Sequence, residues 1–91
     1  MTDWFERNSV SREPPDPEAR AEWLTLAVST REWHPGYDVG DRVRRVVLSG
    51  LERGEVTGFE WRGTHLFALV RYASGRVEAS TASTYCKGDG R

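Results

Sequence analysis

The sequence has few of the residues on which several classes of protein depend. Among its 91 residues are one cysteine, one lysine and two histidines, and no long apolar run. A single cysteine cannot form a disulfide within the chain, so packing has to supply the stability. Short apolar runs argue against a membrane-spanning helix. His34, His65 and Cys86 are widely separated and fit no ligand motif, so we expect neither a metal site nor a cofactor.

Signals for secretion and for catalysis are also missing. Residues 1–10 have no basic segment followed by an apolar one, so no signal peptide is predicted and the cytoplasm is the expected compartment. A chain of this length suffices for one domain and leaves little material for a deep active-site cleft. Cys86 has no base in a recognisable pattern, and no glycine-rich loop with the Lys-Ser/Thr of a nucleotide site is present. We therefore expect a binding protein and not an enzyme.

Charge is distributed unevenly along the chain. Residues 1–36 contain four arginines against seven acidic residues, whereas residues 37–91 contain nine basic residues against seven acidic ones. Twelve of the thirteen basic residues are arginine, whose planar guanidinium suits bidentate contacts with phosphate, carboxylate or guanine. The small positive excess of the second part permits nucleic-acid binding without requiring it.

The residue pattern divides the chain into three segments: a flexible tail over 1–15, an amphipathic helix with its turn over 16–36, and a small β-domain over 37–91. Asp16 is a good N-cap and Pro17 fits the first helical position, which predicts a helix from Pro17 to Trp33. Its broad apolar arc is expected to cover Phe67 and Leu69 on the outer face of a strand.

After Gly36 the apolar pattern changes from helical to alternating. Glycines recur at turn spacing, which favours short strands joined by tight turns. Gly75 lies between two apolar runs, at a position where a hairpin needs a left-handed residue. The predicted strands are Asp41 to Leu48, Gly54 to Trp61, Leu66 to Tyr72, Arg76 to Ser80 and Thr84 to Lys87.

Two stretches resemble a known family. The run Gly40-Asp41-Arg42-Val43, followed by Gly50, Gly54 and Val56, is similar to the opening of a KOW-type SH3-like barrel, and Ala68 to Glu78 is similar to the central hairpin of Tudor-like barrels. The resemblance implies a mainly β fold, a five-stranded SH3-like barrel packed against one N-terminal amphipathic helix. In Tudor-like barrels aromatic residues can form a cage around a methylated cation, for which this chain offers Tyr37, Phe59, Trp61, Tyr72 and Tyr85.

One mixture of arginines and aromatics is the leading candidate for partner binding, because guanidinium groups contact phosphates and aromatic rings stack on bases. It consists of Arg42, Arg44, Arg45, Arg53, Arg62, Trp61 and Tyr72. The alternative is a set of surface arginines that bind nothing.

Two functions remain open at this point. In the first, the chain is a bacterial or viral accessory protein that docks on nucleic acid or on a transcription or translation machine. In the second, it is a protein-only adaptor or inhibitor that grips a partner through the sheet edge, through Trp61, or through Trp4 and Phe5 in the N-terminal tail. The sequence does not specify the oligomeric state.

Overall fold

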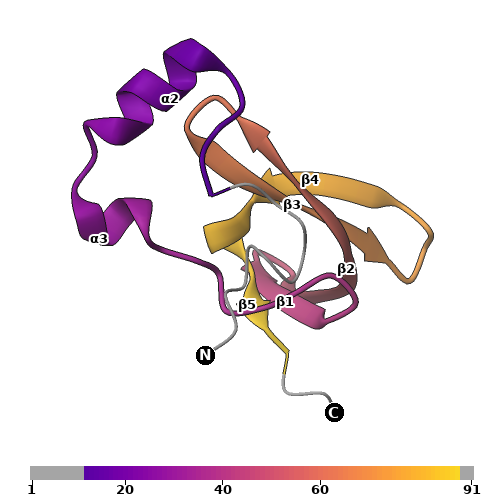
Figure 1. The fold of residues 1–91 in the computed structure, drawn as a ribbon. Helices are drawn as coiled ribbons and strands as arrows, with labels where there is room; N and C mark the ends of the chain where they lie inside the picture. The colour runs from indigo at the N-terminus through magenta and orange to yellow at the C-terminus, as the bar shows by residue number, and fades with distance from the viewer. Residues whose placement is uncertain (1–11, 89–91) are drawn as a thin grey trace.

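The computed structural model describes residues 12–88, which form two short helices followed by an antiparallel sheet (Figure 1). In chain order the elements are α2 (Pro17–Leu24), α3 (Val28–Arg31), β1 (Arg42–Val47), β2 (Gly50–Arg62), β3 (His65–Tyr72), β4 (Val77–Thr81), the 3-10 helix η1 (Ala82–Thr84) and β5 (Cys86–Lys87). All five predicted strands are present. The largest difference is β2, which begins four residues before the predicted start at Gly54.

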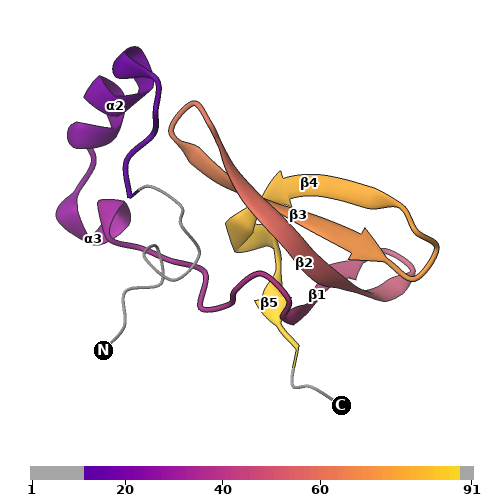
Figure 2. The same cartoon turned by 45° about the vertical axis from the view of Figure 1, so that its right-hand side comes forward.

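The five strands form one sheet in the order β4-β3-β2-β1-β5 (Figure 2). Its two edge strands, β4 and β5, are not paired with each other, so the sheet is not closed into a barrel. Strand β2 is the longest and pairs with β1 through its first part and with β3 through its second. A register shift between Val56 and Gly58 interrupts the second ladder, which is the irregularity that lets a long strand bend.

The core lies on one face of this sheet. The buried positions of β3 alternate as Leu66, Ala68, Val70 and Tyr72, the period expected of a strand with one inner face. They pack in one cluster with Tyr37, Val43, Val56, Ala82 and Tyr85. Tyr37 comes from the segment before β1 and is completely buried, with its hydroxyl donating to the carbonyl of Ala82. That hydrogen bond connects the segment before β1 to η1.

The helix is shorter than predicted. Asp16 caps α2 as expected, since its carboxylate accepts a hydrogen bond from the amide of Ala19 at 3.0 Å, and Pro17 opens the helix. The single helix from Pro17 to Trp33 is, however, wrong, because α2 ends at Leu24. The hydroxyl of Thr25 donates to the carbonyl of Glu22 at 2.6 Å, a local bond that competes with helical continuation. The chain resumes only as the single turn α3.

The helical segment lies beside the end of the β2–β3 hairpin (Figure 2). A cleft between the two, with a volume of about 450 Å³, is lined from the helical side by Trp23, Leu26 and Trp33. Across it lie Trp61, His65 and Leu66. Phe67 and Leu69, which were expected to be covered by the helix, do not line this cleft, and Phe67 is instead covered by the guanidinium of Arg62 at 4.7 Å.

Two glycines shape the hairpins. Gly75 has a φ of +90° and its amide donates to the carbonyl of Tyr72 at 2.8 Å, which confirms the left-handed turn predicted between β3 and β4. Gly54 has a different role. A Cβ at this position would overlap Cγ1 of Val70 and lie 2.8 Å from the carbonyl oxygen of Arg71, so only glycine lets β2 and β3 approach this closely.

Candidate functional site

The β1–β2 hairpin divides the predicted arginine-aromatic group between its two faces. Side chains of successive strand residues point to opposite faces, and directly paired residues point to the same one. Arg44 pairs with Arg53, and Arg45 pairs with Glu52. The side chains of the neighbours Arg44 and Arg45 therefore lie on opposite faces of the hairpin. We call the face that carries Val43, Arg45 and Glu52 the inner face, because Val43 belongs to the core. The face that carries Arg42, Arg44 and Arg53 is the outer face.

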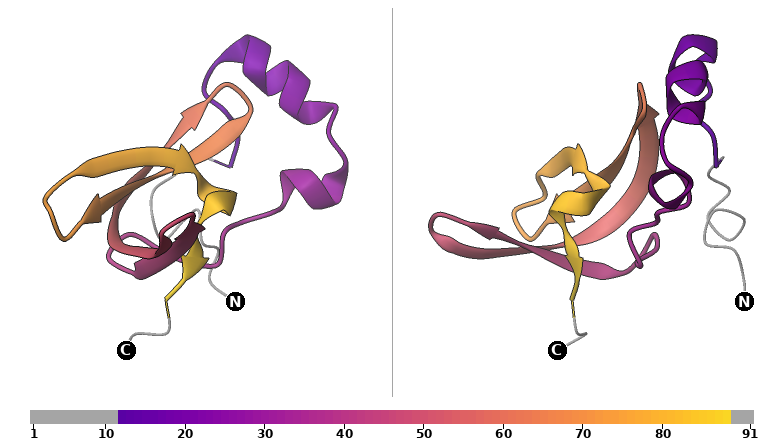
Figure 3. Two further views of the ribbon diagram at one scale, coloured as in Figure 1. Left: turned by 180° about the vertical axis from the view of Figure 1, so that it is seen from behind. Right: turned by 90° about the vertical axis from the view of Figure 1, so that its left-hand side faces the viewer.

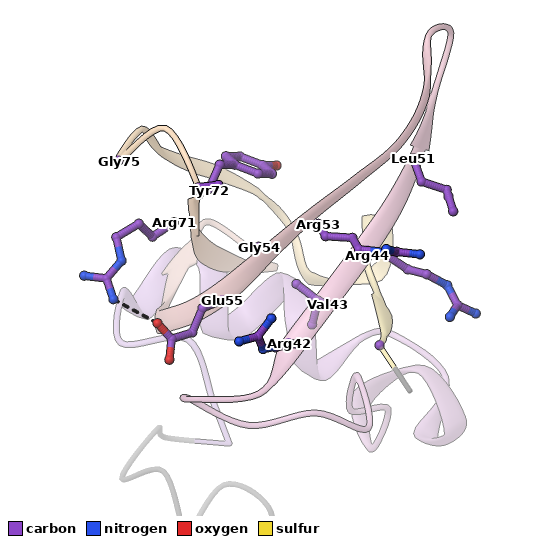
Figure 4. A pocket seen from close by; sticks show the side chains of 12 residues that line it. Arg42, Val43, Arg44, Leu51, Arg53, Gly54, Glu55, Arg71, Tyr72 and Gly75 are labelled. Carbon is purple, nitrogen blue, oxygen red and sulfur yellow. Dashed lines mark hydrogen bonds and ion pairs between the residues drawn. The ribbon is translucent and has the colours of Figure 1, made fainter. Parts of the chain in front are cut away.

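The outer face gathers three of the predicted arginines around one groove (Figure 4). Arg42, Arg44 and Arg53 line it, together with Arg71, Glu55 and Leu51, and its volume is about 630 Å³. Arg44 and Arg53 lie directly opposite each other across the two strands, an arrangement of like charges that disfavours the folded sheet. The outer face therefore concentrates positive charge at some cost in stability.

These three arginines differ from the other arginines of the sheet. Each of the others has a carboxylate partner: Arg62 contacts Glu60 at 2.7 Å, Arg71 contacts Glu55 at 2.8 Å, and Arg76 contacts Glu52 at 3.4 Å. Within residues 12–88, Arg42, Arg44 and Arg53 form no ion pair and no side-chain hydrogen bond. Glu55 is the acidic residue opposite Arg42, but Arg71 holds it (Figure 4). The guanidinium groups of the outer face are thus available to an external anion.

Arg45 has the opposite environment. Its side chain is only 17% exposed and bridges two carboxylates, Glu52 at 2.7 Å and Glu78 at 2.5 Å. Its guanidinium also lies 5.7 Å from the ring centre of Tyr72 and 5.6 Å from that of Tyr85. The hydrogen bond from Arg45 is the main reason that the pKa of Glu52 is lowered, and the Glu52 contact raises the already high pKa of Arg45. Arg45 connects the hairpin to β4, so its predicted role in partner contact is not supported by its position.

The tyrosines are structural and do not form an open cage. The hydroxyls of Tyr72 and Tyr85 are hydrogen-bonded to each other at 2.9 Å in the interior, and Tyr37 is fully buried. Burial is the largest cause of the raised pKa of both Tyr37 and Tyr72. The guanidinium of Arg76 lies over the Tyr72 ring, 4.8 Å from its centre. A cation from outside would have to displace Arg45 and Arg76 from the Tyr72 ring.

The other predicted site residues lie elsewhere. Trp61 and Arg62 are at the far end of β2 from the outer groove, where Trp61 lines the cleft beside the helices and Arg62 pairs with Glu60. Trp4 and Phe5 fall outside the described residues. The predicted group is therefore not one site. Arg42, Arg44 and Arg53 gather on the outer face, and Tyr72 also lines their groove. The other three members, Arg45, Trp61 and Arg62, lie elsewhere.

Sequence reasoning missed an apolar patch at the tip of the same hairpin. Val46 and Leu51 are paired across the strands on the outer face and are 83% and 54% exposed, and Leu48 in the turn is fully exposed. Exposed apolar side chains that adjoin one another are typical of contact surfaces. The sequence pattern could have predicted part of this patch, because alternation along β1 places Val46 on the same face as Arg42 and Arg44.

The residues that a metal site would need are scattered in the described part of the chain. No group of three His, Cys, Asp or Glu side chains in residues 12–88 is arranged to hold a metal ion. Cys86 is exposed in the edge strand β5. Neither helix in this part of the chain has the length and hydrophobicity needed to cross a membrane.

Comparison with known proteins gives no indication of function, so the function has to be inferred from the geometry of the site. No protein-family model, no curated protein and no solved structure matches the chain. The candidate site is accordingly defined by its own residues. They are the outer-face arginines, which have no ion pair within residues 12–88, and the apolar hairpin tip beside them.

Proposed function

We propose that the chain is a non-enzymatic binding module that docks on nucleic acid, alone or within a transcription or translation complex, through Arg42, Arg44 and Arg53. One observation carries the proposal. The other arginines of the sheet are neutralised by carboxylates, whereas these three share one groove and have no ion pair among the described residues. Phosphate groups supply the anionic oxygens that such guanidinium groups bind in bidentate fashion.

We also propose that the sheet is an incompletely closed barrel of the SH3-like kind, similar to KOW and Tudor domains. The strand order, with the short β5 beside β1 and the bent β2 shared by two ladders, supports this interpretation. A fold of this kind hosts many functions, so the nucleic-acid proposal depends on the arginines and not on the fold. The cytoplasm is the compartment in which we expect the protein to act.

The test is a salt titration of binding to fluorescently labelled DNA and RNA oligonucleotides. With three phosphate contacts, the affinity should fall about 40-fold between roughly 50 and 200 mM salt. The double variant Arg44→Glu/Arg53→Glu should lose most of the binding and most of this salt dependence. Arg62→Glu, which changes an ion-paired arginine in the same strand, is the matched control and should bind as the wild type does. Equal binding by the double variant would refute the proposal.

A protein partner is the second candidate. Strand β4 is an edge that pairs only with β3, and Val77 at its start is 55% exposed, so a partner strand could add to the sheet there. This candidate predicts no affinity for nucleic acid at low salt. It also predicts capture of a partner that is lost when a proline replaces Ala79 in β4, because proline removes a backbone donor.

A further inference from the structure

The β1–β2 hairpin extends beyond the rest of the sheet as a two-stranded ribbon (Figure 3). The ladder between β2 and β3 begins at Gly54, and β5 pairs only with Val43 and Arg44 of β1. Residues 45–52 therefore pair only with one another. The outer face of this ribbon carries Arg44 and Arg53 nearest the root, then Val46 and Leu51, and Leu48 lies in the terminal turn.

We propose that this ribbon is an arm that enters the major groove of double-stranded DNA, with Leu48 against the base edges and Arg44 and Arg53 on the flanking phosphates. The inference rests on the proposed function and deepens it, because it names the class of nucleic acid and the residues that contact it. A major groove about 12 Å wide admits a two-stranded β-ribbon.

The spacing along the ribbon fits the depth of that groove. Four residues separate Arg44 from Leu48, which at about 3.4 Å per residue is roughly 13 Å. The major groove is about 8.5 Å deep. When Leu48 reaches the base edges, the backbone of the Arg44–Arg53 pair lies roughly 5 Å outside the groove, a distance that an extended arginine side chain spans. The two guanidinium groups then meet the phosphates on either side.

The charge of the outer face selects the occupant. Its arginines, which have no ion pair in the described part of the chain, favour a polyanion. They disfavour a second copy of this chain, because two such faces would repel each other. The apolar tip favours duplex DNA among polyanions, because the C5-methyl group of thymine presents an apolar contact in the major groove. Double-stranded RNA offers a deep and narrow major groove that protein side chains cannot read.

The inner face holds the arm in place. Arg45 and Glu52 lie opposite each other in the ribbon, and both contact residues of the β3–β4 hairpin: Arg45 bridges to Glu78, and Glu52 contacts Arg76. These contacts fix the root of the ribbon to the sheet. An arm that is ordered before binding pays less conformational entropy when it docks.

The experiment compares three labelled probes of one sequence: a 20-base-pair, thymine-rich DNA duplex, the same duplex with deoxyuridine in place of thymidine, and the corresponding RNA duplex. The wild-type protein should bind the DNA duplex best, and loss of the thymine methyl groups should weaken binding several-fold. Leu48→Ser should reduce affinity for the DNA duplex about tenfold. Val77→Ser, which changes an exposed valine outside the ribbon, is the matched control and should have no effect. Circular dichroism checks that both variants are folded.

The outcomes separate the two proposals. In one outcome, Arg44→Glu/Arg53→Glu abolishes binding, Leu48→Ser binds as tightly as the wild type, and the uridine duplex is bound as tightly as the thymine duplex. This outcome would refute insertion of the ribbon into the major groove and would support nucleic-acid binding by the outer-face arginines. Equal binding of RNA and DNA duplexes also refutes the arm. If the wild-type protein binds none of the probes, or binds them regardless of the arginines, the proposed function fails and the arm fails with it.

Discussion

The inner and outer faces of one hairpin use the same residue type for opposite purposes. On the inner face Arg45 is held by Glu52 and Glu78, while on the outer face Arg44 and Arg53 oppose each other without a carboxylate among the described residues. Arginine that is paired in a partly buried position contributes to cohesion, and removing it leaves uncompensated carboxylates. Arginine that is exposed and unpaired contributes little to stability and remains available for binding. Substitutions should therefore separate the two faces.

The largest expected effect is at the root of the inner face. Gly54→Ala should destabilise the fold by about 3 kcal/mol, because the new methyl group meets the Val70 side chain and the Arg71 carbonyl oxygen. Gly58→Ala is the matched control in the same strand. Its Cβ would lie 3.4 Å from Cδ1 of Leu69, an ordinary contact, so we expect a cost below about 1 kcal/mol. Urea unfolding of the two variants measures the difference, and equal costs would contradict the close approach at Gly54.

The next effect compares adjacent arginines. Arg45→Ala removes the cation between two carboxylates and should lower the melting temperature by about 5 to 10 °C. Arg44→Ala, one residue earlier on the outer face, should change it by less than about 2 °C. Thermal unfolding followed by circular dichroism provides the comparison. A larger loss for Arg44→Ala would show that the faces have been assigned the wrong way round.

The inner face should also respond to acid. The pKa of Glu52 is lowered in the folded protein, chiefly by the hydrogen bond from Arg45. Because the folded state holds this proton less tightly than the unfolded state, the contribution of Glu52 to stability is complete above its ordinary value of 4.5 and is lost as the pH falls through the lowered pKa. Glu52→Gln should therefore be less stable than wild type at pH 7, and the difference should shrink as the pH falls below 4.5.

The control for this pH dependence is Glu52→Gln in a protein that lacks the Arg45 guanidinium. In an Arg45→Met background, Glu52→Gln should produce a smaller pH-dependent stability difference, because Arg76 still lowers the pKa of Glu52 but the main cause has been removed. A pH-dependent difference of undiminished size in that background would contradict the main role given to Arg45. Chemical unfolding at several pH values measures both pairs of proteins.

The smallest effect is a gain in stability on the outer face. Arg53→Glu replaces a directly opposed pair of like charges with an oppositely charged pair, which should stabilise the hairpin by about 0.5 kcal/mol. The same change should weaken binding to nucleic acid. A variant that is more stable and binds nucleic acid less tightly would show that the like charges of Arg44 and Arg53 lower the stability of the hairpin but strengthen binding. Loss of stability in Arg53→Glu would contradict this interpretation.

Local patterns predicted most of the fold, and non-local contacts explain what they missed. Alternation along β3, the cap at Asp16 and the left-handed Gly75 each depend on a few neighbouring residues, and all three are confirmed. The helix was predicted too long because its apolar arc continues past Thr25, whereas the hydroxyl of Thr25 bonds back to the Glu22 carbonyl.

The candidate site was only partly predictable for the same reason. Strand alternation is enough to place Arg44 and Arg45 on opposite faces. It does not show that Arg45 meets Glu78, a residue of β4 that reaches Arg45 only through the fold. Nor does it show that Arg71 forms an ion pair with Glu55, so that Arg42 does not have Glu55 as its partner. Which arginines are available depends on these tertiary ion pairs.

The pairing of β5 with β1 makes the protein convenient for labelling. Cys86 is the sole cysteine, is exposed, and lies directly opposite Arg44 in this ladder, so both side chains project from the same face of the sheet. A maleimide dye would attach at this one position without any substitution. The dye would then lie beside the outer-face arginines, and its fluorescence would report on the arrival of a ligand at that face.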